Sequence, residues 1–180
     1  MVFKNYSFIA FVYAFTLLQL SCGNNKDEPV KKTDIESKEF KDKLVDANKI
    51  YVKRESDEID QYVKRKGWDM SATGTGLRYM ITQKGTGVMP QTEQKVRLNF
   101  KVRLLDGTLC YSSDSTGIYE FVVDKSGVET GLHEGVKYLH VGDKATMILP
   151  SHLAYGLIGD EKCIPARASV LYELELLSVK

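Results

Sequence analysis

The sequence is poor in the residues that metal and nucleophile chemistry require. Its three histidines, at their spacings and without a cysteine or carboxylate pattern beside them, match no zinc motif. There is no Gly-x-Ser-x-Gly sequence, and Ser151 and His152 are direct neighbours, which does not aim a base at a nucleophile. Gly85, Gly87 and Gly107 fit turns rather than a phosphate-binding loop. We therefore expect no metal, no cofactor, no hydrolysis and no nucleotide binding.

Net charge is also nearly absent. The chain has 25 basic and 24 acidic side chains, and Lys4 is the only charged residue before Cys22. A chain that starts at Cys22 therefore has 24 of each sign, with no block of one sign. Nucleic-acid binding relies on clustered positive charge, so no nucleic-acid partner is predicted. No internal repeat is present, and 180 residues suit one ordinary domain with appendages.

No apolar run is long enough to cross a bilayer comfortably as a helix. The run from Phe8 to Leu20 has 13 residues, whereas a spanning helix needs about 20. With Lys4 before it, this run fits an export signal. It ends in Leu-Ser-Cys-Gly around Cys22, which resembles a bacterial lipobox, although Gln19 stands where that pattern usually has Leu. The sequence predicts a signal peptide over residues 1–21 and lipidation of Cys22, with plain secretion or an uncleaved anchor as the alternative.

Two segments follow the signal. Residues 22–33 are polar and contain a proline, which predicts a flexible tether. Lys26-Asp27-Glu28 resembles a surface-export signal of some Bacteroidota lipoproteins, and it also suits an ordinary solvated linker. The sequence predicts a helical spacer over residues 34–71. The helical spacing of its apolar residues is interrupted near Glu55, which indicates two helices or one bent helix. Its apolar stripe is expected to pack on the domain or on a second copy, giving a dimer; the stripe comprises Phe40, Leu44, Ala47, Tyr51, Ile59, Tyr62 and Val63.

Strand-like alternation begins after Gly76. From Val96 to Leu104, apolar and polar residues alternate, which is typical of a half-buried strand. Asp106-Gly107 predicts a hairpin turn. Further strands are predicted at 109–112, 118–123, 145–149 and 168–176.

One short helix is predicted among these strands, over residues 127–139. Val128, Leu132, Val136 and Leu139 form its apolar stripe, and Gly142-Asp143 follows as a stop signal. A single helix among about five antiparallel strands predicts an α+β fold, in which a half-barrel sheet wraps around the helix.

The last third of the chain has the most specific motif. The segment Ser151-His-Leu-Ala-Tyr-Gly156, followed by Ile164-Pro165 and a strand-like run to Leu177, resembles the FKBP-type peptidyl-prolyl cis-trans isomerases. The Gly107 turn and the helix near Gly131 fit that family at the right spacing. The resemblance covers roughly residues 72–180 and implies an FKBP-like domain with isomerase activity. In that family an Ala-Tyr-Gly turn opens a loop over a dry pocket that eases rotation about Xaa-Pro bonds.

The resemblance also assigns roles to individual residues. Tyr155 matches the loop tyrosine whose hydroxyl donates to a substrate carbonyl, and Phe100 and Tyr172 match strand aromatics of the catalytic pocket. Substrate-binding positions follow at Tyr119 on the wall, Val128 at the helix entrance and Ile164 on the loop. Each of these residues also suits ordinary core packing, because strands carry aromatic side chains readily.

The chain departs from the family pattern in its pocket. Cys110 and Tyr111 stand where the family has Phe-Asp, which removes the pocket carboxylate and one aromatic wall. Leu132 replaces the floor tryptophan, and Glu129 replaces an apolar residue. We expect Tyr111, Glu129 and Leu132 to line a shallower, less polarised substrate site. A non-catalytic chaperone or binding module that uses this groove is therefore the alternative function.

The family fold brings Cys110 and Cys163 to opposite sides of the groove rim. The resemblance therefore implies a disulfide bond between them, which suits an exported protein. Two reduced cysteines that fill apolar space are the alternative.

In its length, spacer and lipid signal the chain resembles the gliding-motility-associated isomerase lipoproteins of Bacteroidota. This resemblance implies a lipid-anchored protein of the cell envelope, in the outer membrane and on its periplasmic face. Its partners would be proline-containing segments of exported proteins, whose folding it would assist, with gliding-motility proteins among them. A purely structural envelope lipoprotein is a more distant alternative.

Overall fold

The computed structural model describes residues 38–180. The predicted signal peptide, the lipidation site Cys22, the tether and the first residues of the predicted spacer lie outside the described residues. Within the described part, residues 47–180 belong to one compact unit. No helix among the described residues is long and apolar enough to span a membrane.

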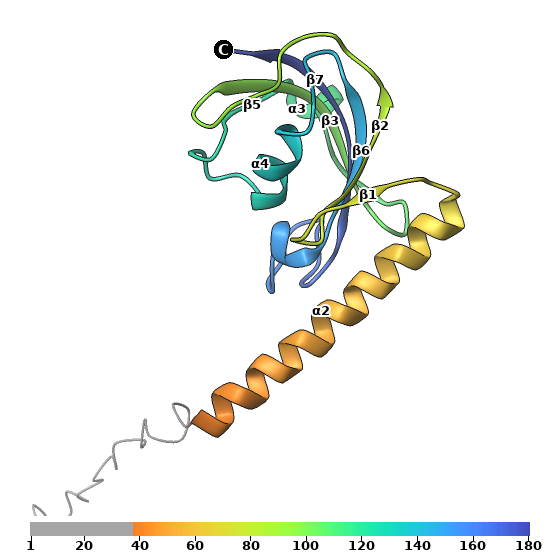
Figure 1. Cartoon of the computed structure of the whole chain (residues 1–180), viewed down its shortest axis with the longest axis vertical. Helices are drawn as coiled ribbons and strands as arrows, with labels where there is room; N and C mark the ends of the chain where they lie inside the picture. Colours follow the sequence, from red (N-terminus) through yellow and green to blue (C-terminus); the bar gives the residue numbers. More distant parts are fainter. Residues whose placement is uncertain (1–37) are drawn as a thin grey trace, which may run out of the picture. The chain divides into compact units, whose positions relative to one another are not determined.

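The described chain begins with a long helix and continues into a sheet interrupted by short helices (Figure 1). The helices are α2 (Lys38–Lys66), α3 (Ser113–Thr116) and α4 (Thr130–Val136), with a 3-10 turn, η1 (Ser151–Leu153). The strands are β1 (Ser71–Ala72), β2 (Arg78–Gln83), β3 (Lys95–Leu104), β4 (Leu109–Ser112), β5 (Tyr119–Val122), β6 (Lys144–Leu149) and β7 (Val170–Val179).

All strand pairs of this sheet are antiparallel, in the order β1-β2-β6-β7-β3-β4, and β5 pairs with β3. The longest pairing joins β3 and β7, from Val96 opposite Val179 to Leu104 opposite Val170. The alternation seen in the sequence places Val96, Leu98 and Val102 in the core, each at most 1% exposed. The predicted α+β fold with an antiparallel open sheet is confirmed.

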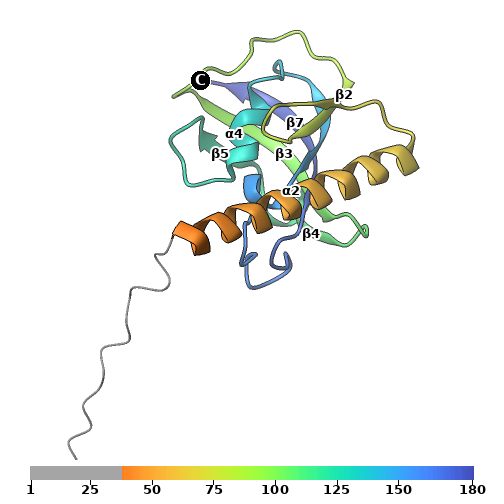
Figure 2. The ribbon, with the colours of Figure 1, turned by 60° about the horizontal axis from the view of Figure 1, so that its bottom comes forward.

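Helix α4 packs into the concave face of the sheet (Figure 1 and Figure 2). Leu132 and Val136 of α4 are fully buried in the same core as Met147 of β6. The close approach depends on Gly131, because a Cβ there would lie 2.7 Å from Cγ of Leu149. The helix is shorter than the predicted 127–139, since the N–H groups after Val136 bond three residues back in tight turns.

Helix α2 is one continuous helix rather than two. Its residues Ile59 and Tyr62 form a second apolar cluster with Ile148 of β6 and Leu171 of β7. Ile148 alternates with Met147 along β6, so this cluster lies on the opposite face of the sheet from α4. The segment predicted as a spacer therefore contributes part of its length to the folded unit.

Polar contacts reinforce this attachment. Arg78 of β2, 7% exposed, donates to Asp60 at 2.8 Å and to Ser56 at 2.6 Å. Nearer the start of α2, Phe40 and Leu44 have exposed side chains. A dimer through the N-terminal helices stays a prediction.

Candidate functional site

An apolar cavity of about 410 Å³ lies where β3, β5 and β7 meet the segment between β6 and β7. We call that segment, residues 151–169, the pocket loop. Six of the nine predicted catalytic and substrate-binding residues line the cavity: Phe100, Tyr111, Tyr119, Glu129, Tyr155 and Tyr172. The lining also includes Val102, Thr116, Gly117, Ile118, Asp160 and Lys162.

Strand aromatics form the wall of the cavity. Phe100 of β3 and Tyr119 of β5 have ring centroids 5.4 Å apart, in a tilted arrangement that suits aromatic packing. Tyr172 of β7 is 2% exposed and lies opposite Val102 in the strand register. The period of two along β3 therefore directs Phe100 and Val102 to the same face as these rings.

Tyr155 comes from the pocket loop, just after the turn η1. The turn is held by bonds from Leu153 N–H to the Pro150 carbonyl and from Gly156 N–H to the Ser151 carbonyl, at 2.9 and 2.8 Å. Gly156 takes a φ of +66°, which a glycine adopts without strain. Burial raises the pKa of the Tyr155 hydroxyl, and the Glu129 carboxylate raises it further. The hydroxyl, which is neutral at physiological pH in any tyrosine of ordinary pKa, therefore holds its proton still more strongly.

Glu129 places a carboxylate beside these tyrosines. Its backbone carbonyl accepts from Leu132 at the start of α4, while its side chain turns to the cavity. The Tyr172 hydroxyl donates to Oε1 at 3.1 Å. Oε2 is enclosed and has no hydrogen-bond partner among the described residues. Burial, and then the Glu129 charge, raise the pKa values of Tyr119 and Tyr172.

Asp160 supplies a second carboxylate at the rim. Its Oδ2 accepts from the Tyr111 hydroxyl, and its Oδ1 accepts from the N–H groups of Lys162, Cys163 and Ile164 at 3.0, 3.0 and 2.7 Å. Burial opposes ionisation, but these hydrogen bonds prevail and lower the pKa of Asp160. The hydrogen bond to Asp160, followed by burial, raises the pKa of the Tyr111 hydroxyl.

The expected loss of the pocket carboxylate needs correction. Tyr111 does replace the acidic residue of the family pattern, but Glu129 and Asp160 both line the cavity. Asp160 reaches it because the pocket loop folds back over β4, where Tyr111 lies. A polarised pocket is therefore built from different positions in the chain.

Three predicted substrate-binding side chains lie outside the cavity lining. Leu132 and Ile164 are 0% and 2% exposed and belong to the hydrophobic core, and Val128 is partly buried against it. The prediction that the side chains of Leu132 and Ile164 line the site is corrected, because they belong to the core beneath it and are absent from the cavity lining. Contact of a substrate with the backbone at Val128, which the family resemblance implies, stays a prediction.

A disulfide bond joins Cys110 of β4 to Cys163 of the pocket loop, with an S–S distance of 2.06 Å and a Cα–Cα distance of 5.5 Å. This is the pair that the family resemblance implies. The bond lies close in sequence to both members of the Tyr111–Asp160 contact. The outer part of the pocket loop is therefore attached to β4 twice.

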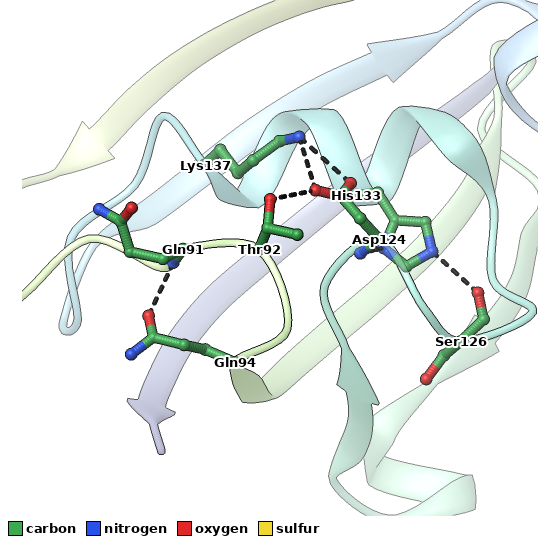
Figure 3. A network of polar contacts seen from close by, with 7 residues as sticks. All are labelled: Gln91, Thr92, Gln94, Asp124, Ser126, His133 and Lys137. Carbon is green, nitrogen blue, oxygen red and sulfur yellow. Dashed lines mark hydrogen bonds and ion pairs between the residues drawn. The ribbon is translucent and has the colours of Figure 1, made fainter.

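His133 is used structurally, in a network that holds the connection between β5 and α4 (Figure 3). The Asp124 N–H donates to Nδ1 of His133 at 2.9 Å, so the neutral ring bears its proton on Nε2 and donates to the Ser126 carbonyl. Lys137 and Thr92 also bond to the Asp124 carboxylate. Among the described residues no group of three His, Cys, Asp or Glu side chains could hold a metal ion.

Sequence reasoning missed half of the lining. Thr116 is the last residue of α3 and Gly117 is its C-cap, and the Ser112 hydroxyl caps the start of this helix by accepting from Asp114 N–H at 3.1 Å. A Ser-Ser-Asp sequence is a readable capping signal, but it gives no information about a cavity. Ile118 is an exposed apolar residue at the rim, and that exposure could not be seen from the alternation alone.

The comparisons with known proteins agree with this geometry. The model of the family "FKBP-type peptidyl-prolyl cis-trans isomerase" matches residues 87–177. The Escherichia coli (strain K12) "FKBP-type 22 kDa peptidyl-prolyl cis-trans isomerase" is 32% identical over 122 residues, which are 67% of this chain and 57% of that protein. The FKBP-type isomerase FkpA of the same organism is 34% identical, over 67% of this chain and 43% of that protein.

A third relative is the probable FKBP-type isomerase FkpA of Neisseria meningitidis serogroup B, 30% identical over 76% of this chain and 51% of that protein. The chain thus spans about half the length of the curated relatives it matches. The family match covers the strands and the pocket loop from which the cavity is built. The chain belongs to the family of FKBP-type peptidyl-prolyl cis-trans isomerases.

Proposed function

We propose that this protein catalyses cis–trans isomerisation of Xaa-Pro bonds in segments of exported proteins and thereby assists their folding. The observation that supports this most directly is the aromatic cavity with Tyr155 at its edge, in a chain of the isomerase family. The reaction needs neither a nucleophile nor a metal. It needs an environment that favours the twisted bond over the planar one.

The physical requirement follows from the amide itself. Its resonance imposes a barrier of about 20 kcal/mol, so uncatalysed rotation about Xaa-Pro takes tens of seconds or more. A twisted amide has lost part of its resonance, and its carbonyl depends less on water. A dry cup formed by Phe100, Tyr119 and Tyr172 therefore binds the twisted bond better than the planar one, which is the differential binding that lowers a barrier.

Two groups can orient the substrate. The Tyr155 hydroxyl is protonated at physiological pH, as a tyrosine hydroxyl ordinarily is, and it lines the cavity, so it can donate a hydrogen bond to a peptide carbonyl. Glu129 already accepts from Tyr172, which keeps that ring in place on the wall. Each tenfold gain in rate requires only about 1.4 kcal/mol of preference for the twisted state.

One observation favours the alternative of a binding module without catalysis. The Asp160 carboxylate is occupied by Tyr111 and by three backbone N–H groups, so it is not free to polarise a bound peptide. A pocket in which the Asp160 carboxylate is saturated can still hold an apolar, proline-containing segment. The two functions therefore share the site and differ in whether the bond rotates faster in it.

The decisive experiment compares two substrates. We expect the protein to accelerate isomerisation of an Ala-Leu-Pro-Phe tetrapeptide and refolding of a protein limited by proline isomerisation. Tyr138→Phe is a matched control, since Tyr138 stacks on Tyr79 away from the cavity. Suppressed aggregation without faster isomerisation in either assay would establish the binding module instead.

For location we propose the cell envelope, with a lipid on Cys22 that anchors the protein in the outer membrane on its periplasmic face. The support is the predicted export signal and the sequence around Cys22 that resembles a lipobox. Wild-type protein should partition into detergent, and Cys22→Ser should release it or block its processing. Recovery of the wild type in the soluble fraction would contradict the anchor. Gliding-motility proteins are the narrowest proposed clients, supported by the resemblance to the Bacteroidota lipoproteins alone.

A further inference from the structure

The pocket loop contributes three residues to the cavity: Tyr155, Asp160 and Lys162. It has little regular structure beyond η1, so its shape depends on how its two ends are held. It leaves the sheet after β6 and returns at β7. Its position is therefore decided at Ser151, where it begins, and at Ser169, where it ends.

Both ends are bound by one side chain from α2. Glu55 is 5% exposed. Its Oε1 accepts from the Ser151 N–H at 2.7 Å and from the Ser169 hydroxyl at 2.7 Å, while its Oε2 accepts from the Ser151 hydroxyl at 3.0 Å. One carboxylate therefore fixes the separation between the first and last residues of the loop.

A second contact from α2 lies close to Tyr155. The Tyr51 hydroxyl donates to the Arg167 carbonyl at 3.1 Å, and the Arg167 guanidinium lies 4.7 Å from the centre of the Tyr51 ring. The Arg167 N–H in turn donates to the Gly156 carbonyl at 3.0 Å. This chain of bonds leads from the helix to the residue next to Tyr155.

We propose that Glu55 is a positioning residue of the isomerase site, which makes α2 part of the machinery that sets the pocket loop. The proposal rests on the proposed function for its effect on turnover. It goes beyond the family match, which covers residues 87–177 and does not include α2. Glu55 does not line the cavity, so it acts through the loop residues, Tyr155 above all.

Glu55→Gln tests the proposal with almost no change in volume. A glutamine can keep one oxygen for the Ser151 N–H and the Ser169 hydroxyl, but it loses the charge, and its NH₂ group can face the Ser151 hydroxyl only if that hydroxyl turns from donor to acceptor. Since hydrogen bonds to a charged group are among the stronger ones, we expect kcat/KM on the Ala-Leu-Pro-Phe tetrapeptide to fall roughly tenfold. Glu58→Gln is the matched control, because Glu58 is exposed on the same helix, and it should leave kcat/KM unchanged.

Amide hydrogen exchange separates the positioning role from general stability. In Glu55→Gln we expect faster exchange at the bonded amides of the pocket loop, such as those of Gly156 and Arg167, and unchanged exchange in β3 and β7. Equal loop exchange in the two variants would overturn the proposal. Uniform acceleration across the whole chain would overturn it too. This readout does not depend on activity, so it remains decisive even if the wild type proves not to be an isomerase.

A double-mutant cycle tests whether Glu55 acts through Tyr155. If it does, Glu55→Gln should reduce kcat/KM much less in a Tyr155→Phe background than in the wild type. For a wild type without isomerase activity, affinity for the same tetrapeptide replaces kcat/KM in the cycle. Strictly additive losses would show that Glu55 affects the site by another route, and the assignment would fail.

Discussion

The two sides of the cavity are built by different forces. The wall consists of Phe100, Tyr119 and Tyr172, which belong to strands paired over many backbone hydrogen bonds. The pocket loop has almost no such pairing, and a few specific anchors hold it: the Glu55 carboxylate, the Asp160 carboxylate and one disulfide bond. A wall of this kind can move only if the sheet unfolds. A loop of this kind can move whenever an anchor is released.

The difference locates where the site can adapt. Proteins open locally with free energies that range from near zero up to the full unfolding free energy, and elements with few anchors open first. The wall therefore supplies a fixed apolar surface, whereas the hydroxyl of Tyr155 depends on loop anchors that can be removed singly. Substitutions on the two sides should differ both in size and in kind.

The largest effect on the loop side of the cavity is expected from the covalent anchor. Replacing both Cys110 and Cys163 with alanine opens a cross-link whose ends are 53 residues apart. In the chain-entropy account this costs up to about 4 kcal/mol of unfolding free energy. The loss of unfolding free energy is measured by urea unfolding of the double variant, compared with the oxidised and the reduced wild type. If all three unfold at the same urea concentration, the bond is not formed in solution.

The next effect concerns the support beneath the wall. Leu132→Ala removes a fully buried side chain of α4, and such a truncation costs about 2 to 5 kcal/mol because a cavity is left behind. We expect the midpoint of thermal unfolding to fall, with faster amide exchange throughout the sheet rather than in the pocket loop alone. Leu157→Ala, at an exposed loop residue, is the control. If exchange increased only in the pocket loop, the proposed difference between the sheet wall and the loop would be contradicted.

A smaller effect is expected at Tyr155. Tyr155→Phe keeps the ring and removes the donor, so affinity for a proline peptide should fall by about 1 kcal/mol, the usual net contribution of one hydrogen bond. Tyr155→Ala should cost more, because part of the apolar surface is lost as well. Isothermal titration with the tetrapeptide measures both, and Tyr138→Phe serves as control. If neither variant at Tyr155 changes the affinity, the peptide binds elsewhere.

The smallest effect concerns pH. The folded protein lowers the pKa of Asp160, so its ionised form stabilises the loop above the pKa that an aspartate has in the unfolded chain, about 3.9. That stabilisation is lost as the pH falls through the lower folded-state value. Amide exchange at Ile164, corrected for its intrinsic pH dependence, should therefore accelerate at acid pH. Asp160→Asn should show the faster exchange at Ile164 already at neutral pH. If this variant has the same pH dependence of exchange as the wild type, Asp160 does not anchor the loop.

Most of the wall could be predicted from the sequence, and much of the loop could not. Period-two alternation from Val96 to Leu104 revealed β3, because one face of an antiparallel strand is buried while the other is wet. The motif around Tyr155 indicated the pocket. Asp160 was missed because its partners, Tyr111 and three backbone N–H groups, are decided by the return path of the loop.

The helix contains a more specific lesson. The break in its apolar stripe near Glu55 suggested two helices or one bent helix, and α2 is one helix from Lys38 to Lys66. Glu55 interrupts the apolar stripe because this buried residue meets Ser151 and Ser169, and the apolar burial resumes at Ile59. A charged residue in a helix is usually solvated. The sequence alone does not indicate that Glu55 binds a residue 96 positions further along the chain. Such a break can mark a buried polar contact as well as a bend.

The disposition of Glu55 constrains how this domain can change over time. One carboxylate accepts hydrogen bonds from two hydroxyls and a backbone N–H. If evolution replaces Glu55 with an apolar residue, these three buried or half-buried donors lose their acceptor. Losing the side chains of Ser151 and Ser169 instead leaves the buried carboxylate with one of its three donors, the backbone N–H at position 151. Helix and loop are therefore expected to be inherited as a pair, and a chimera that exchanges the loop between two relatives should fold well only when it takes the matching helix with it.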